Sequence, residues 1–146
     1  MRALSYHASP GLMDVFVKAI EDKNPYVRFS AVEAVSRIPN SEEAARLLVK
    51  LCSSEDEITS LKAASGLGYM AEIRNRYAFS LRKEMLDAMK RLFAGMGKDS
   101  KRKDSGWAYR NLGDAFLCFG PDGERCLKEF ISSSSADRSL CEKAWK

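Results

Sequence analysis

A short motif that recurs along the chain at intervals of about thirty residues limits the fold more than any other feature of this sequence. It consists of a small residue, two others, a second small residue and a large apolar one, and one copy runs from Ala31 to Val35. Its small–large pair recurs at Gly66-Leu67, Ala115-Phe116, Ala144-Trp145 and Ala3-Leu4. Small residues let two helices approach closely, and large ones fill the space between layers. The recurrence therefore predicts stacked helical units with a common seam, and not a closed bundle.

Apolar residues follow the three- and four-residue steps of an α-helix along most of the chain, and no comparable run alternates with a period of two. Capping side chains followed by proline or acidic residues mark helix starts at Asn24-Pro25, at Ser41 and within 119–123. Helices this short are unstable alone, so we expect antiparallel pairs. The predicted structure is all-α, with helices over 10–22, 25–38, 41–53, 56–70, 78–96, 105–119, 121–133 and 136–145.

The composition is that of a folded chain. Hydrophobic residues make up 45% and charged residues 30%, which excludes a disordered or collagen-like protein. A length of 146 residues suits one domain or a short array of repeats. No stretch approaches the roughly 20 apolar residues of a membrane helix, so no membrane is expected as a partner.

The predicted helices group into one repeat domain over residues 1–146. Its units lie at about 10–40, 41–71, 74–119 and 120–146, and the third is longer than the others. Both chain ends fall inside a unit, and a solenoid needs polar end caps. This predicts a fragment of a longer array, with a frayed natural terminus as the alternative.

Residues 24–35 resemble a HEAT repeat. The Asn24-Pro25 start, the Val27-Arg28 pair and the Ala-x-x-Ala-aliphatic core stand where that family has them, whereas the later units depart from the Val-Arg pair. The resemblance implies a right-handed α-solenoid of about four antiparallel helix pairs, armadillo-like in architecture. It also implies that Arg28 pairs with an acid of the neighbouring layer.

HEAT solenoids expose the second helix of each pair along a concave wall that binds other macromolecules, so the resemblance points to the non-core residues of those helices. Aromatic and arginine side chains on such a wall are typical interface anchors. A plainer interpretation of Phe29 and Trp107 is packing against adjacent helices. We expect a non-catalytic scaffold that binds a protein partner, with candidate contacts at Tyr26, Phe29, Glu33, Arg37, Lys62, Tyr109, Arg110 and Asp114.

Positive charge is concentrated in the second half of the chain. The net charge is +4, and residues 71–110 hold 11 basic and 5 acidic residues. A basic loop within this region carries Lys98, Lys101, Arg102 and Lys103. The basic part of this region, 74–110, supports an alternative function, a nucleic-acid-binding solenoid similar to HEAT-like DNA glycosylases. Trp107, Tyr109, Arg110 and Asp114 would take part in such a site. A merely solvated loop explains the same charges, and a structural spacer within a larger enzyme is a third possibility.

The residues that carry most enzyme chemistry are sparse. The chain has one His, no C-x-x-C pair and no H-E-x-x-H motif, so no metal, cofactor or catalytic residue is predicted. The acidic clusters stand at helix starts, where the helix dipole explains them. The four cysteines Cys52, Cys118, Cys126 and Cys141 are expected to be reduced and partly buried, although Cys126 could be exposed and reactive. Unpaired thiols favour a reducing compartment such as the cytoplasm, while the localisation stays unassigned.

Overall fold

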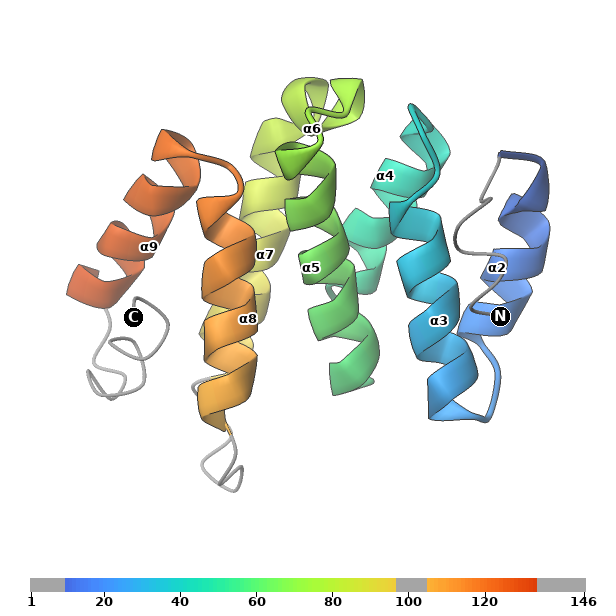
Figure 1. The fold of residues 1–146 in the computed structure, drawn as a ribbon. Coiled ribbons are helices and arrows are strands. Elements are labelled where there is room, and N and C mark those ends of the chain that lie inside the picture. Colours follow the sequence, from blue (N-terminus) through green and yellow to red (C-terminus); the bar gives the residue numbers. More distant parts are fainter. Residues whose placement is uncertain (1–9, 97–104, 134–146) are drawn as a thin grey trace.

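A computed structural model describes residues 10–96 and 105–133 of the chain, and within these ranges it contains helices and no strands. The all-α prediction is confirmed (Figure 1). The elements are η1 (Pro10–Leu12), α2 (Met13–Ile20), α3 (Pro25–Ser36), α4 (Glu42–Leu51), α5 (Glu57–Glu72), α6 (Arg76–Ser80), α7 (Arg82–Met96), α8 (Ser105–Leu117) and α9 (Pro121–Ser133).

Two predicted helices need comment. The helix expected over 78–96 is divided at Leu81 into the short α6 and the longer α7, and its start moves to Arg76. The helix expected over 136–145 lies outside the described residues. None of the helices among the described residues combines the length and the apolar character that crossing a bilayer requires.

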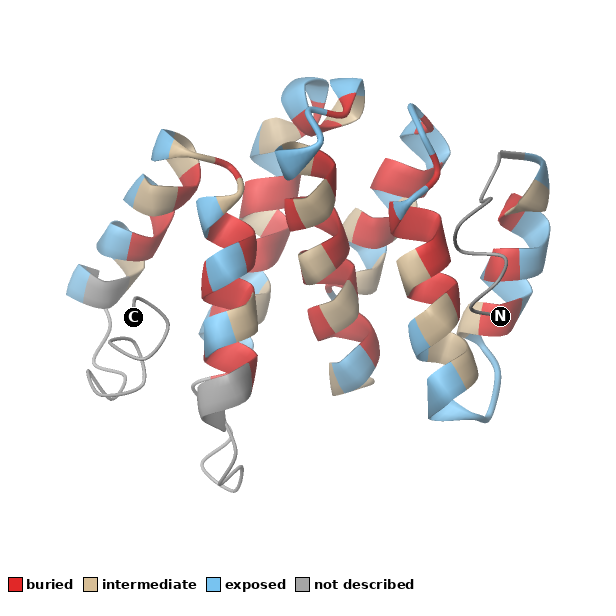
Figure 2. Ribbon diagram, viewed as in Figure 1, coloured by how far each residue is buried: buried red, intermediate tan, exposed pale blue. Residues whose placement is uncertain are grey.

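The helices form packed pairs, α2 with α3, α4 with α5 and α7 with α8. The second members of these pairs, α3, α5 and α8, also pack on one another and lie side by side, with α4 and α7 behind them (Figure 1). Buried residues occupy the surfaces where the helices meet (Figure 2). The predicted stack of helix pairs is therefore present, and its core is continuous from α2 to α9.

Small residues permit the close approach of α3, α5 and α8, as the recurring motif predicts. A Cβ atom added to Gly66 would lie 2.8 Å from the Cβ of Ser36 on α3. One added to Gly68 would lie 2.8 Å from the Cα of Ala115 on α8. The large residues that follow the small ones are buried between the layers: Val35, Leu67 and Phe116.

The predicted helix starts are confirmed by their caps. The side chain of Asn24 accepts a hydrogen bond of 2.9 Å from the backbone N–H of Tyr26, and Pro25 takes the first helical position. The Oγ of Ser41 accepts one of 3.2 Å from the N–H of Ala44. Each cap satisfies a backbone donor that the first turn of a helix leaves without a partner.

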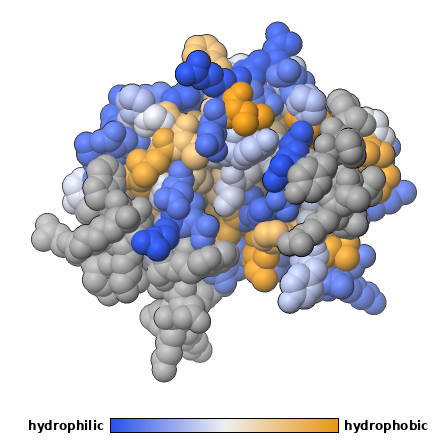
Figure 3. Space-filling view, in the orientation of Figure 1, coloured by the Kyte–Doolittle hydropathy of each residue, from blue (hydrophilic) through white to orange (hydrophobic). Residues whose placement is uncertain are grey.

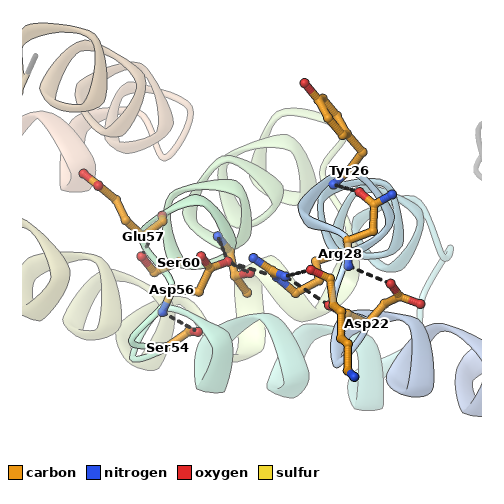
Figure 4. Close-up of polar contacts among 10 residues, drawn as sticks. Asp22, Tyr26, Arg28, Ser54, Asp56, Glu57 and Ser60 are labelled. Carbon is orange, nitrogen blue, oxygen red and sulfur yellow. Dashed lines mark hydrogen bonds and ion pairs between the residues drawn. The ribbon is translucent and has the colours of Figure 1, made fainter.

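Arg28 joins the first two helix pairs, as the family resemblance implies. Its Nε lies 3.3 Å from Oδ2 of Asp56, the residue that caps α5. Its Nη1 donates hydrogen bonds of 3.0 and 3.1 Å to the carbonyl oxygens of Asp22 and Lys23, in the turn between α2 and α3 (Figure 4). The predicted structural role of Arg28 is confirmed.

Arg82 makes a comparable connection at the opposite end of the stack. Its Nε donates a hydrogen bond of 2.6 Å to Oδ2 of Asp122 in the first turn of α9, and its Nη2 donates to the carbonyl oxygen of Phe119. Gly120, with a φ of 64°, adopts a left-handed conformation in the turn between α8 and α9. One side chain at the start of α7 therefore holds this turn and the start of α9.

Tyr109 lies in the core, so the prediction that it is part of an exposed wall is wrong. Its side chain is 2% exposed and contacts Phe93 of α7 edge to face, with ring centroids 5.0 Å apart. The reason is its register on α8, because Tyr109, Leu112 and Phe116 follow three- and four-residue steps and belong to one buried stripe. Cys126 is buried too, contrary to the expectation that it could be exposed.

Candidate binding surface on α3, α5 and α8

Tyr26, Phe29 and Glu33 of α3 and the C-cap residue Arg37 follow three- and four-residue steps, which places their side chains on one face of the helix, away from its buried residues. Lys62 of α5 meets this face. Its Nζ lies 4.3 Å from the centroid of the Phe29 ring and 3.8 Å from Oε1 of Glu33. The structure thus brings these five predicted residues together on two neighbouring helices.

A cleft of about 580 Å³ lies between the first turns of α3, as far as Glu33, and the first turn of α5. Three of the residues that line it are large and hydrophobic, and they are exposed by 82% (Tyr26), 37% (Phe29) and 46% (Ile58). Figure 3, in the orientation of Figure 1, shows hydrophobic surface at the lower end of α5 beside that of α3. The cleft is completed by Pro25, Ser30 and Glu33.

Sequence reasoning missed Ile58 and Tyr69, and the repeat itself could have found them. A shift of 32 residues, the spacing between Ala34 and Gly66, carries Tyr26 onto Ile58 and Arg37 onto Tyr69. In the structure Ile58 lines the cleft, and the guanidinium of Arg37 lies 5.5 Å from the Tyr69 ring centroid. Equivalent positions in successive units therefore face the same surface.

Two cations share one carboxylate beside the cleft. Oε1 of Glu33 lies 3.2 Å from Nη2 of Arg37 and 3.8 Å from Nζ of Lys62. Burial lowers the pKa of Lys62, Glu33 opposes that effect, and Arg37 adds to it. The ammonium group of Lys62 is therefore held in a partly desolvated place.

The α8 part of the surface differs from the cleft. Arg110 and Asp114 are exposed one turn apart, as expected, but they do not line the cleft. Cys118, at the end of α8, has a raised pKa because of burial and of the carboxylates of Glu72 and Asp114. The surroundings of the Cys118 side chain are therefore acidic, whereas the cations Arg37 and Lys62 lie beside the cleft. The side chain of Trp107 and the basic loop residues Lys98, Lys101, Arg102 and Lys103 lie outside the described residues.

The described residues hold no group of histidine, cysteine or acidic side chains suited to a metal ion. Burial raises the pKa of Cys52 to about 12, so this thiol stays protonated at neutral pH and is a poor nucleophile. The cysteines Cys52, Cys118 and Cys126 are free in the structure. Among the described residues, this surface offers shape, hydrophobic area and charge.

The stacked pairs, the close approach of α3, α5 and α8, and a surface on those second helices define an α-helical repeat protein. A family model of HEAT repeats matches residues 1–68. That part of the chain is similar to HEAT repeats, and the fold is the HEAT repeat fold. Comparison with curated proteins and with solved structures gives no match.

Proposed function

We propose that this chain is a scaffold that binds a protein partner on the face formed by α3, α5 and α8, with the cleft between α3 and α5 as the central contact. HEAT repeats are in general protein-interaction scaffolds. A preformed stack of helices presents such a face without ordering the backbone on binding, which lowers the entropic cost of association. Binding on this surface involves no bond chemistry.

The observation that carries this proposal is the clustering of exposed hydrophobic side chains. Eight large hydrophobic residues are exposed in the part of the chain that the structure describes, and three of them, Tyr26, Phe29 and Ile58, line one cleft. Scattered hydrophobic residues are normal on a protein surface, whereas a concave cluster bordered by charge is typical of an interaction site. Aromatic residues are also the commonest energetic anchors of protein interfaces.

The mixture of charges on this face favours a protein over a nucleic acid. Arg37, Lys62 and Arg110 alternate there with Glu33 and Asp114. A surface that follows a phosphate backbone needs a more continuous positive potential. The basic loop that suggested nucleic-acid binding lies outside the described residues, and both that alternative and the spacer within a larger enzyme stay predictions.

Affinity capture with paired variants tests the proposal. The wild type and a Phe29→Ser, Ile58→Ser double variant are used as bait for cross-linked partners, which are quantified by mass spectrometry. Phe79→Ser is the matched control, because Phe79 of α6 is 83% exposed and lies away from the cleft. We expect the double variant to lose a protein partner that wild type and control retain, with all three melting at similar temperatures. Partners retained by the folded double variant would contradict the proposal.

A further inference from the structure

The segment from Ile73 to Lys83 combines exposed hydrophobic side chains with positive charge. It contains four basic and no acidic residues, and it forms the turn after α5, the short α6 and the start of α7. Phe79 of α6 is 83% exposed, more than any other large hydrophobic residue that the structure describes, and Ile73 is 49% exposed. A single exposed hydrophobic residue is normal on a protein surface, so the cations beside these two are what distinguish the segment.

One exposed stripe of this segment carries an aromatic ring between two cations. Arg76, Phe79 and Lys83 follow three- and four-residue steps and are exposed, whereas the buried residues at the same steps are Ala78, Leu81 and Met85. The backbone N–H of Met85 donates a hydrogen bond of 2.9 Å to the carbonyl oxygen of Leu81, so helical bonding continues from α6 into α7. This part of the chain lies at one edge of the stack (Figure 1), where hydrophobic and strongly hydrophilic surface adjoin (Figure 3).

Only one of the four cations of the segment forms an ion pair that holds the fold. Arg82 is engaged by Asp122 at the start of α9. Arg74, Arg76 and Lys83 form no ion pair with any residue that the structure describes. The guanidinium of Arg76 lies 5.8 Å from the ring centroid of its neighbour Tyr77. Three exposed cations are therefore available to a ligand.

Arg74 occupies a backbone position that favours glycine. Its φ is 53°, and it ends α5 in a Schellman motif. In this motif the N–H of Asn75 donates a hydrogen bond of 2.9 Å to the carbonyl oxygen of Met70, and the N–H of Arg74 donates one of 3.1 Å to that of Ala71. Glycine adopts such a conformation at less cost than arginine. The stability of the turn therefore does not explain the arginine, which adds an exposed charge next to Ile73.

We propose that the α6 tip, defined as Ile73, Arg74, Arg76, Phe79 and Lys83, binds the anionic surface of a lipid membrane. The two hydrophobic side chains enter the headgroup region, and the three cations meet acidic headgroups. The expectation that no membrane is a partner concerned a spanning helix, and binding at a lipid surface requires none. This site is separate from the cleft and does not depend on the protein-binding function proposed above.

The make-up of the α6 tip favours a lipid surface over a nucleic acid. Proteins that hold single-stranded nucleic acid stack the bases on aromatic rings within a positively charged groove. Here the segment lies at an outer edge of the stack, and Ile73 offers no ring for stacking (Figure 1). Isoleucine and phenylalanine both suit the apolar side of a membrane interface, where neighbouring cations add attraction for acidic lipids.

Sedimentation of the full chain with lipid vesicles tests this inference. Vesicles of phosphatidylcholine alone are compared with vesicles in which about 30% of the lipid is the acidic phosphatidylserine. We expect binding to the acidic vesicles alone. Raising the ionic strength to about 0.5 M should release the protein, because salt screens exposed charges. The molar partition coefficient is the quantity compared among variants.

Phe79→Ser should lower the partition coefficient by at least about tenfold, since it removes a large hydrophobic side chain. Arg76→Gln and Lys83→Gln should each lower it by about fivefold, the effect of one cation near an acidic surface. Arg74→Gly should lower it to a similar extent while the melting temperature stays equal or rises, because glycine suits the positive φ. Glu84→Gln removes the exposed acid beside Lys83 and should raise the partition coefficient.

The matched controls are Lys18→Gln, at an exposed lysine of α2, and the Phe29→Ser, Ile58→Ser double variant of the cleft. Both should bind acidic vesicles as the wild type does. Equal binding to neutral and acidic vesicles, or equal binding by Phe79→Ser and the double variant, would overturn the inference. A wild type that stays in the supernatant, or that binds a fluorescent single-stranded oligonucleotide more tightly than acidic vesicles, would overturn it too. Circular dichroism establishes that each variant is folded.

Discussion

The Nε atom of Arg28 lies 3.3 Å from Oδ2 of Asp56, 28 residues later in the sequence, and this ion pair connects the first two helix pairs. Asp56 also caps α5, where its side chain accepts hydrogen bonds from the backbone N–H and the hydroxyl of Thr59. The carboxylate of Asp56 therefore caps the start of α5 and also joins α5 to α3 of the preceding helix pair. The hydrogen bond from Thr59, together with Arg28, lowers the pKa of Asp56.

We expect Asp56→Asn to lower the free energy of unfolding by about 1 kcal/mol at neutral pH, since the ion pair is partly exposed and Asn still caps the helix. The pKa of Asp56 is lower in the folded than in the unfolded chain. The stabilisation is therefore complete above the ordinary carboxyl pKa and is lost as the pH falls through the folded-state value. Urea unfolding at a series of pH values measures it.

The difference between wild type and Asp56→Asn should narrow below about pH 4, near the ordinary pKa of an aspartate. Glu43→Gln serves as the control, because Glu43 is an exposed first-turn acid of α4 with no ion pair in the described structure. A difference that stays constant from neutral to acid pH would show that the Asp56 charge does not stabilise the fold.

We expect two glycines within helices to affect the stability of the fold in opposite directions when each is replaced by alanine. Gly68→Ala should destabilise the fold by about 1–3 kcal/mol, because its Cβ meets the backbone of Ala115, which cannot rotate away. Gly95→Ala should stabilise by about 0.5–1 kcal/mol, since Gly95 lies in α7 with nothing within 4 Å of an added Cβ. Thermal unfolding of both variants measures the effects. Equal effects of the two substitutions would contradict the close approach of α5 and α8.

Most of the fold was predictable because it depends on local patterns. The small residues Ala34, Gly66 and Ala115 recur where adjacent helices touch, and caps such as Asn24 and Ser41 act within their own first turns. A helix start and a position of close helix packing can both be recognised from a few consecutive residues. These features needed no knowledge of distant contacts.

The errors have physical causes too. The apolar stripe runs through Leu81 into Met85, so the spacing gave no sign that α6 ends and α7 begins there. The repeat alignment gives Tyr109 a non-core position in the third unit, although its three- and four-residue spacing to Leu112 and Phe116 places it in the core. The cleft needs Ile58, whose exposure depends on how α5 packs beside α3, and hydrophobicity alone suggests burial for such a residue.

The burial of Tyr109 predicts a sharp contrast with its neighbour on α8. Tyr109→Ala should lower the free energy of unfolding by about 3–5 kcal/mol, because it leaves a cavity beside Phe93. Arg110→Ala should change it by less than about 0.5 kcal/mol, since Arg110 is exposed. Urea unfolding of the two single variants distinguishes them. Comparable stability of the two variants would mean that Tyr109 is not a core residue. If Tyr109→Ala is much less stable, as expected, any loss of partner binding by this variant reflects unfolding and not a lost contact.

We expect a substitution of Arg82 to destabilise the stack locally, at the end where α9 packs. Arg82→Met removes the hydrogen bonds to Asp122 and to the carbonyl oxygen of Phe119, and these join α7 to the start of α9. Helix α9 packs mainly on α8 and α7, at the last described layer, so it should open more often without them. Hydrogen exchange followed by mass spectrometry should show faster exchange in peptides from 121–133.

Exchange in α3 is the internal reference for this experiment, because α3 lies at the other end of the stack and nearest-neighbour contacts carry stability along a repeat array. Lys83→Met is the matched control, since Lys83 is the next residue of α7 and is exposed. Uniformly faster exchange throughout the Arg82→Met chain would show that the layers unfold as one cooperative unit. Unchanged exchange in α9 would show that its packing on α8, and not Arg82, holds it in place.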